Sequence, residues 1–228
     1  MASSSSNLSH WQPAPLPEPV TLTGRWVTLE PLSAAKHTPA LWQAVQGHDE
    51  AWNWLADGPY SREEGLAEAL EAKQSGLAAR FFAILPGSNS AAAGYASLMR
   101  MDPANGVIEV GNIMFSPSLQ RTPAATEAMF LMARYIFEEL GYRRYEWKCN
   151  ALNLPSRRAA ERLGFTFEGI FRQHMIVKGR NRDTAWYSML DSEWPACKSA
   201  FEAWLAPENF DAEGTQKRAL SSLRAISQ

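Results

Sequence analysis

The chain has 228 residues, with 22 basic and 24 acidic side chains and a formal net charge of −2 at pH 7. Because both signs are interspersed along the sequence, no basic stripe is available to neutralise a nucleic-acid backbone, and we expect no nucleic-acid partner. The length favours one globular domain with a sizeable core.

The N-terminus and the cysteines indicate a cytoplasmic protein. Ser3 to Ser6 follow Met1-Ala2 without the charged and apolar regions of a secretory signal. No apolar run approaches the ~20 residues that a membrane helix needs. Cys149 and Cys197 are too few for a disulfide scaffold and are not spaced as metal ligands. We therefore expect a reducing compartment, no membrane partner and no metal.

The first part of the chain predicts an arm, a strand and two helices. Residues 1–19 are rich in Ser and Pro and lack periodicity, which is typical of a flexible or surface-bound arm. Alternating apolar and β-branched residues over 21–32 predict the first strand. Helices follow over 39–46 and from Ser61, because Ser61-Arg-Glu-Glu64 matches a capping box.

The middle of the chain predicts a meander of three strands and then the longest helix. The strands are separated by turns rich in Gly, Pro and Asn, and they cover residues 81–85, 92–101 and 107–115. Apolar side chains at helical spacing predict a helix over 124–140 that ends at Gly141. Its apolar side comprises Ala125, Met129, Met132, Ala133, Ile136, Phe137 and Leu140.

The last part predicts a strand, a helix, a hairpin and a final helix. These elements cover residues 144–149, 154–163, 165–178 with 182–190, and 193–205. A polar tail follows. We therefore expect one domain over 20–206, preceded by the arm over 1–19 and followed by the tail over 207–228.

A strand, a loop and a helix start meet over residues 107–126 in a way that suits phosphate binding. The first turn of a helix has free backbone N–H groups and the positive end of the helix dipole. Arg121, Thr122 and Thr126 add side-chain donors. The alternative is an ordinary helix start that Thr122 caps.

Three motifs occur in a fixed order: Ile108 to Ile113, Gln120 to Ala128, and Asn153 to Ser156 followed by Gly164-Phe165. They resemble the GNAT superfamily of N-acetyltransferases, and within it the Rim-type branch that acetylates N-terminal amines of ribosomal proteins and various small amines. The resemblance covers about residues 21 to 195. It implies an α/β (α+β) fold with a mixed, mostly antiparallel sheet of six or seven strands and helices on both faces. Two central strands, 107–115 and 144–149, would splay apart as a V.

The resemblance also implies acetyl-CoA as co-substrate. The backbone of Ile113, Met114 and Phe115 would contact the pantetheine arm, Asn153 would bond its amide, and Ser156 would bind near the sulfur and protonate the leaving thiolate. The pyrophosphate would lie on Gln120, Arg121, Thr122, Ala124, Ala125 and Thr126. This loop departs from the family pattern at Pro123, which stands in place of a glycine and lacks a backbone donor.

Attack of an amine on a thioester needs a proton acceptor, an oxyanion donor and a donor for the sulfur. Glu109 is the predicted base, directly or through one water, because a carboxylate within an apolar strand is costly without a role or a partner. The alternative is an ion pair with Arg100 or another arginine. A backbone N–H near Met114 is the predicted oxyanion donor. We expect direct acetyl transfer to a primary amine, either a protein N-terminus or a small molecule.

Trp54 and Tyr60, with Glu109, are the predicted contacts of the acceptor. Trp52, Trp147 and Trp186 are interpreted either as walls of that pocket or as core residues. His174 and both cysteines are interpreted as structural residues. The roles of Arg172 and Asp183 stay open. Apolar Trp194, Phe201 and Trp204 suggest a possible homodimer. Two rival functions remain: a catalytically silent acyl-CoA-binding module, and a protein-interaction domain without a CoA site.

Overall fold

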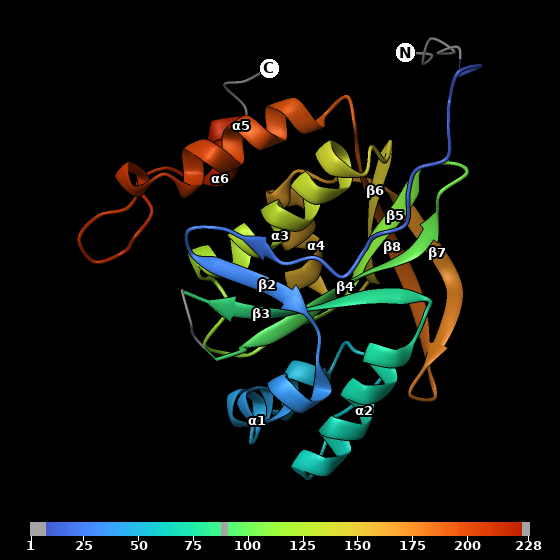
Figure 1. The fold of residues 1–228 in the computed structure, drawn as a ribbon, viewed down its shortest axis with the longest axis vertical. Helices are drawn as coiled ribbons and strands as arrows, with labels where there is room; N and C mark the ends of the chain where they lie inside the picture. Colours follow the sequence, from blue (N-terminus) through green and yellow to red (C-terminus); the bar gives the residue numbers. More distant parts are fainter. Residues whose placement is uncertain (1–7, 88–90, 225–228) are drawn as a thin grey trace.

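The computed structural model describes residues 8–87 and 91–224, and across them the chain forms one eight-stranded sheet in the order β1-β2-β3-β4-β5-β6-β8-β7 (Figure 1). The strands are β1 (Leu22–Thr23), β2 (Val27–Pro31), β3 (Ala79–Pro86), β4 (Gly94–Asp102), β5 (Val107–Phe115), β6 (Arg144–Asn150), β7 (Thr166–Val177) and β8 (Arg180–Leu190). Among these described strands only β5 and β6 pair in parallel; the other neighbours are antiparallel. The predicted mixed, mostly antiparallel sheet is confirmed.

The number of strands exceeds the predicted six or seven because the segment 21–32 is not one strand. It turns back on itself, so that Leu22 of β1 pairs with Leu29 of β2. The turn between them is held by a side chain from far along the chain: the carboxylate of Glu127 accepts hydrogen bonds from the backbone N–H groups of Arg25, Trp26 and Val27.

Helices cover both faces of the sheet, as predicted (Figure 1). They are α1 (Ala34–Val45), the 3₁₀ turn η1 (Asp49–Trp52), α2 (Glu63–Ser75), α3 (Pro123–Arg134) with the π-helical turn η2 (Tyr135–Glu139), α4 (Leu154–Leu163), α5 (Trp194–Leu205), the 3₁₀ turn η3 (Pro207–Asn209) and α6 (Leu220–Arg224). Helices α1 and α2 lie on one face, α3 and α4 on the other, and α5 and α6 pack outside α3 and α4. None of the described helices has the length and apolar character needed to cross a membrane.

Two predicted helix starts were wrong. Helix α1 begins at Ala34 and not at Pro39, because the Ser33 hydroxyl accepts a hydrogen bond from the backbone N–H of Lys36 and caps it. Helix α2 begins at Glu63 with Arg62 as its cap position and no side-chain cap. The predicted capping box would need the helix to start one residue earlier, so Ser61 and Glu64 do not satisfy each other's backbone donors.

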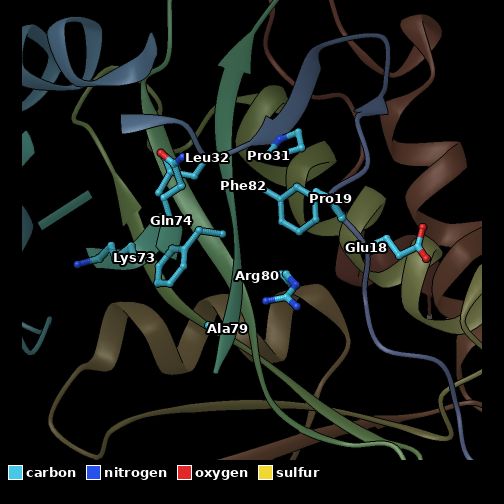
Figure 2. A pocket seen from close by; sticks show the side chains of 10 residues that line it. Glu18, Pro19, Pro31, Leu32, Lys73, Gln74, Ala79, Arg80 and Phe82 are labelled. Atoms are coloured by element: carbon cyan, nitrogen blue, oxygen red, sulfur yellow. The ribbon is translucent and has the colours of Figure 1, made fainter. Parts of the chain in front are cut away.

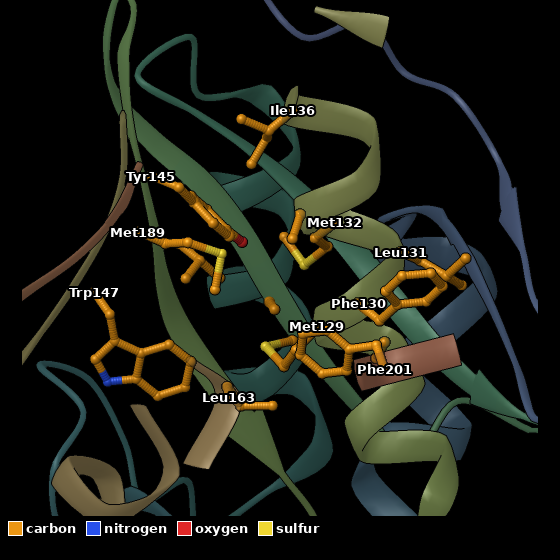
Figure 3. Packing of buried hydrophobic residues seen from close by; sticks show 14 of the residues in the cluster. Met129, Phe130, Leu131, Met132, Ile136, Tyr145, Trp147, Leu163, Met189 and Phe201 are labelled. Atoms are coloured by element: carbon orange, nitrogen blue, oxygen red, sulfur yellow. The ribbon is translucent and has the colours of Figure 1, made fainter. Parts of the chain in front are cut away.

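Helix α3 is buried on all sides and not on one stripe. Met129 and Met132 face the sheet near Tyr145 and Met189, whereas Phe130 packs against Phe201 of α5 (Figure 3). A helix that is apolar all round is typical of the interior of a protein. The predicted apolar side is thus only part of what α3 buries: α5 covers Phe130, and the turn between β1 and β2 covers Glu127.

The described parts of the predicted arm and tail both contact the domain. The indole Nε1–H of Trp11 donates to the carbonyl of Ala104 at 2.8 Å, and the backbone N–H of Glu18 donates to the Tyr135 hydroxyl at 3.0 Å. Leu220 and Leu223 of α6 are buried in the main core. Part of the predicted tail is therefore packed against the domain. The predictions that concern residues 1–7, 225–228 and the turn at 88–90 lie outside the described residues.

Candidate active site

Strands β5 and β6 separate halfway along their length. Their parallel pairing covers Val107–Val110 with Arg144–Trp147 and goes no further. A bulge at Asn112, whose φ is +49°, gives β5 one extra residue opposite β4 and bends it. The V-shaped splay predicted from the sequence is therefore confirmed, and its open end begins after Val110.

The splay connects the two faces of the sheet. On β6, the Trp147 indole Nε1–H donates to the Ser156 hydroxyl of α4 at 3.0 Å, so Trp147 faces the α3–α4 side. The next residue, Lys148, points to the opposite face, because side chains alternate along a strand. There its Nζ lies 2.9 Å from Oε2 of Glu109. Ser156 and Glu109 thus lie on opposite faces beside the same gap.

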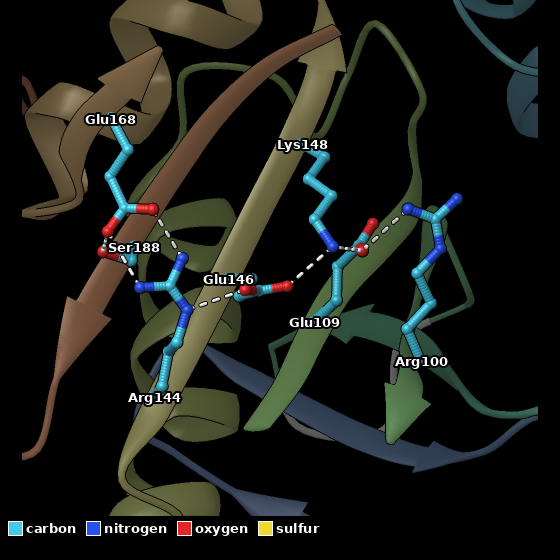
Figure 4. A network of polar contacts seen from close by, with 7 residues as sticks. All are labelled: Arg100, Glu109, Arg144, Glu146, Lys148, Glu168 and Ser188. Atoms are coloured by element: carbon cyan, nitrogen blue, oxygen red, sulfur yellow. Dashed lines mark hydrogen bonds and ion pairs between the residues drawn. The ribbon is translucent and has the colours of Figure 1, made fainter. Parts of the chain in front are cut away.

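Glu109 is buried within an ion-pair network (Figure 4). Its Oε2 lies 3.3 Å from Nη1 of Arg100, so the ion pair named as the alternative interpretation is confirmed. The second partner, Lys148, was not predicted; its Nζ also lies 2.6 Å from Oε2 of Glu146 and 3.8 Å from the centre of the Trp186 ring. The only signal in the sequence was the charged alternation of residues 144–148.

Arg144 and Glu168 extend this network toward the edge of the sheet. The Arg144 guanidinium binds Glu146 at 2.7 Å and Glu168 at 2.6 Å. Its hydrogen bond to Glu168, followed by its contacts with Glu146, raises the pKa of Arg144, and the same hydrogen bond lowers the pKa of Glu168. The carboxylates and cations therefore alternate from Glu168 to Arg100, which fixes the position of Glu109.

Thr122 caps helix α3, and this capping was part of the alternative interpretation. Its hydroxyl accepts a hydrogen bond from the backbone N–H of Ala125 at 3.1 Å and donates to the carbonyl of Leu119 at 2.7 Å. Pro123 is the first helical residue, a position that suits its fixed φ. The amide of Gln120 donates to the carbonyl of Phe115 at 3.0 Å, which ties the loop to the end of β5.

The helix start still has backbone donors to offer. Within the described part of the chain, no acceptor takes a hydrogen bond from the backbone N–H of Arg121, Thr122 or Ala124. Arg121 has a φ of +62°, a left-handed conformation that helps neighbouring N–H groups converge on an anion. The Thr126 hydroxyl, in contrast, accepts from Nη1 of Arg162 at 3.2 Å. The loop therefore fits a pyrophosphate through its backbone more than through the predicted hydroxyls.

Asn153 and Ser156 stand at the start of α4 beside the splay. The Asn153 side chain accepts from the backbone N–H of Ser156 at 3.1 Å and caps the helix. Because the Ser156 oxygen accepts from Trp147, its own O–H can donate elsewhere. Burial raises the pKa of the neighbouring Cys149, although a hydrogen bond with Ser156 opposes this shift. Cys149 and Cys197 are both buried free thiols, as the structural interpretation predicted.

The loop after α1 lies against the β7–β8 hairpin on the Glu109 side. The Lys178 ammonium donates to the carbonyl of Trp52 at 3.0 Å, and the Trp52 ring is buried in the smaller core. Trp54 is exposed. The Tyr60 hydroxyl donates to Asp57 at 2.7 Å, and burial, followed by that hydrogen bond, raises the pKa of Tyr60. The Tyr60 ring also packs edge-on against Trp52, with 5.0 Å between the ring centres, and a role of Trp54 and Tyr60 in binding an acceptor stays a prediction.

Two of the remaining candidates, His174 and Asp183, have structural partners. His174 Nδ1 lies 3.0 Å from the Thr184 hydroxyl, and Asp183 accepts from the backbone N–H of Gln173 at 2.7 Å. The stated reason for a homodimer was wrong, because Trp194, Phe201 and Trp204 are buried in the core of the chain itself.

A separate hollow of about 230 Å³ lies between residues 18–19, the end of α2 and strand β3 (Figure 2). Lys73, Gln74 and Arg80 line it, together with Phe82. None of the predicted site residues contributes to its wall. Within the described ranges, no group of three or more His, Cys, Asp or Glu side chains is arranged to hold a metal ion.

Comparisons with known proteins agree with this geometry. Residues 27–166 match the acetyltransferase (GNAT) domain family. A GCN5-related N-acetyltransferase from Brucella melitensis is 53% identical, with a TM-score of 0.93 over 96% of this chain and 100% of that one. The uncharacterized N-acetyltransferase YnaD of Bacillus subtilis is 27% identical over 67% of this chain and 89% of its own length.

A more distant structure shares the fold alone. It is an acetyltransferase of Salmonella typhimurium that modifies the N-terminal serine of a 50S ribosomal subunit protein, with 23% identity and a TM-score of 0.61 over 73% of this chain and 96% of that one. The matched family covers more than half of the sequence, includes both arms of the splay and ends at the first residue of β7. This chain therefore belongs to the GNAT family of acetyltransferases.

Proposed function

We propose that this protein transfers an acetyl group from acetyl-CoA to a primary amine by direct attack. One observation carries the proposal: strands β5 and β6 separate beside a helix start, with a buried carboxylate on one face of the gap and a serine hydroxyl on the other. The free backbone N–H groups at Arg121, Thr122 and Ala124 would hold the pyrophosphate. The open edges of β5 and β6 would hold the pantetheine arm.

The residues at the gap divide the proton transfers between them. Glu109 takes the proton of the attacking amine, directly or through one water, because only the neutral amine is a nucleophile. A backbone N–H near Met114 stabilises the oxyanion. Ser156 donates a hydrogen bond to the departing sulfur, and the indole N–H of Trp147 holds the serine oxygen in place. No covalent enzyme intermediate is required.

The test is a thiol-release assay with purified protein, acetyl-CoA and a panel of peptides, polyamines, amino acids and aminoglycosides. We expect free thiol to appear with at least one amine and only in its presence. Calorimetric binding of CoA without thiol release across the panel would instead favour a silent acyl-CoA-binding module. The absence of any thermal shift with CoA would favour a protein-interaction domain.

The change Ser156→Ala should lower kcat by about 10²-fold, the low end of what a positioned acid contributes. It removes the donor to the sulfur and leaves the Trp147 N–H without its acceptor. The measurement is steady-state thiol release at saturating acetyl-CoA. Ser199 is an exposed serine on helix α5 and provides a matched control: Ser199→Ala should leave kcat unchanged. An equal loss in both variants would remove Ser156 from the mechanism.

A further inference from the structure

Two buried donors on strand β8 lack an acceptor. Within the described residues, Nε of Arg182 and Nε1 of Trp186 are buried without a hydrogen-bond partner. Such atoms are rare in folded proteins, because the hydrogen bonds that they lose to water are normally replaced. Both atoms can only donate. They therefore point to a ligand that brings acceptor atoms.

These donors share a face of the sheet with Glu109. Trp186 stands directly opposite Lys148 in the β6–β8 pairing, and opposite residues lie on the same face. Lys148 in turn binds Glu109. Arg182 and Trp186 are four positions apart on a strand whose side chains alternate, so they too lie on one face. The unpaired donors thus belong to the acceptor side of the gap.

The charge of this cluster favours an anion. On this face Glu109 pairs with Arg100 and Lys148, and Glu146 pairs with Lys148. Among the described residues, no carboxylate forms an ion pair with Arg182. Burial lowers the pKa of Arg182, and the like charge of Arg100 adds to the effect, whereas Cys149 and Glu109 oppose it. Arg182 is thus a partly buried cation without an ion-pair partner of its own among the described residues, near a Glu109 carboxylate that Arg100 and Lys148 already bind.

We propose that Arg182, assisted by the Trp186 indole, binds a carboxylate of the acceptor, so that the preferred substrates are amines that carry a carboxylate near the amino group. This inference rests on the proposed acetyl transfer. A guanidinium offers paired N–H groups that match a carboxylate. A polyamine would instead bring a second ammonium toward Arg100 and Arg182, and like charges repel. A free amino acid and an acidic peptide N-terminus both provide this chemistry.

Matched acceptors test the inference. The first pair is phenylalanine, which has the carboxylate, and phenylalaninamide, which lacks it. The second pair consists of two tetrapeptide amides that begin Ser-Asp and Ser-Asn. Spermidine is the polycation for comparison. We expect kcat/KM to favour the carboxylate member of at least one pair by about 10-fold or more, as for a charge-assisted hydrogen bond. The pair that shows the preference identifies the source of the carboxylate. Arg182→Met should abolish the preference, and Arg182→Lys should retain part of it.

Controls separate this inference from the proposed function. Arg180→Met, an exposed change on the same strand, should keep the preference. Turnover of both members at equal rates, or a preference that survives Arg182→Met, overturns the carboxylate site but leaves the acetyl transfer intact. If no amine is turned over, calorimetry of the same pairs with the CoA-bound protein decides: binding that needs both the carboxylate and Arg182 supports the site, and equal or absent binding overturns it.

Discussion

The change Glu109→Gln is expected to lower kcat for acetyl transfer by about 10²- to 10⁴-fold, the range that a positioned general base contributes. Glutamine keeps the size of the side chain but cannot take a proton from the amine. CoA affinity should be unchanged, because the free backbone donors of the helix start lie on other residues. Thiol-release kinetics give kcat, and calorimetry gives the Kd of CoA.

A loss of ion pairs alone would produce a different pattern. Glu109 and Glu146 both bind the Lys148 ammonium, at 2.9 Å and 2.6 Å, so Glu146→Gln disturbs the same network without removing the proposed base. We expect Glu146→Gln to lower the melting temperature at least as much as Glu109→Gln does. Its effect on kcat should be far smaller. Equal losses of kcat in the two variants would mean that Glu109 has a structural role only.

The change Glu127→Gln is expected to lower the free energy of unfolding by about 3 kcal/mol, because hydrogen bonds to a charged group are among the stronger ones and an unpaired buried donor is costly. Glu127 is only 5% exposed, and its two carboxylate oxygens accept from three backbone N–H groups, including those of Arg25 and Val27 at 3.0 Å. An amide nitrogen in place of one oxygen would face a donor.

Urea unfolding followed by tryptophan fluorescence measures this change. The matched control is Glu139→Gln, an exposed residue in the turn η2 that follows the same helix, which should change the free energy of unfolding by less than about 0.5 kcal/mol. A loss below about 1 kcal/mol in Glu127→Gln would show that water replaces the missing acceptor.

Regular elements with strong local patterns could be predicted from the sequence, and elements held by distant partners could not. The helix α3 together with its turn η2, and the hairpin of β7 and β8, were predicted within a few residues, because their periodicity and turn residues are local. The break between β1 and β2 depends on Glu127, which is about one hundred residues away. The wrong start of α2 arose because a four-residue pattern does not fix where a helix begins.

The candidate site shows the same division. Glu109 and its partner Arg100 were foreseen, since an acidic residue in an apolar strand needs a partner. Lys148, Trp147 and the unpaired donor of Arg182 depend on which residues of β6 and β8 lie side by side. That register joins two strands that helix α4 and strand β7 separate along the chain, so it cannot be derived from local spacing.

The separation of β5 from β6 has a kinetic consequence. Ser156 and Glu109 flank the opening from opposite faces of the sheet. The thiol carrier and the amine would therefore enter from opposite faces, and neither would block the other. Double-reciprocal plots of rate against one reactant, at several levels of the other, should then give lines that intersect. Parallel lines would instead indicate a ping-pong mechanism, in which the carrier leaves before the amine binds. Direct transfer across the opening does not need that order of events.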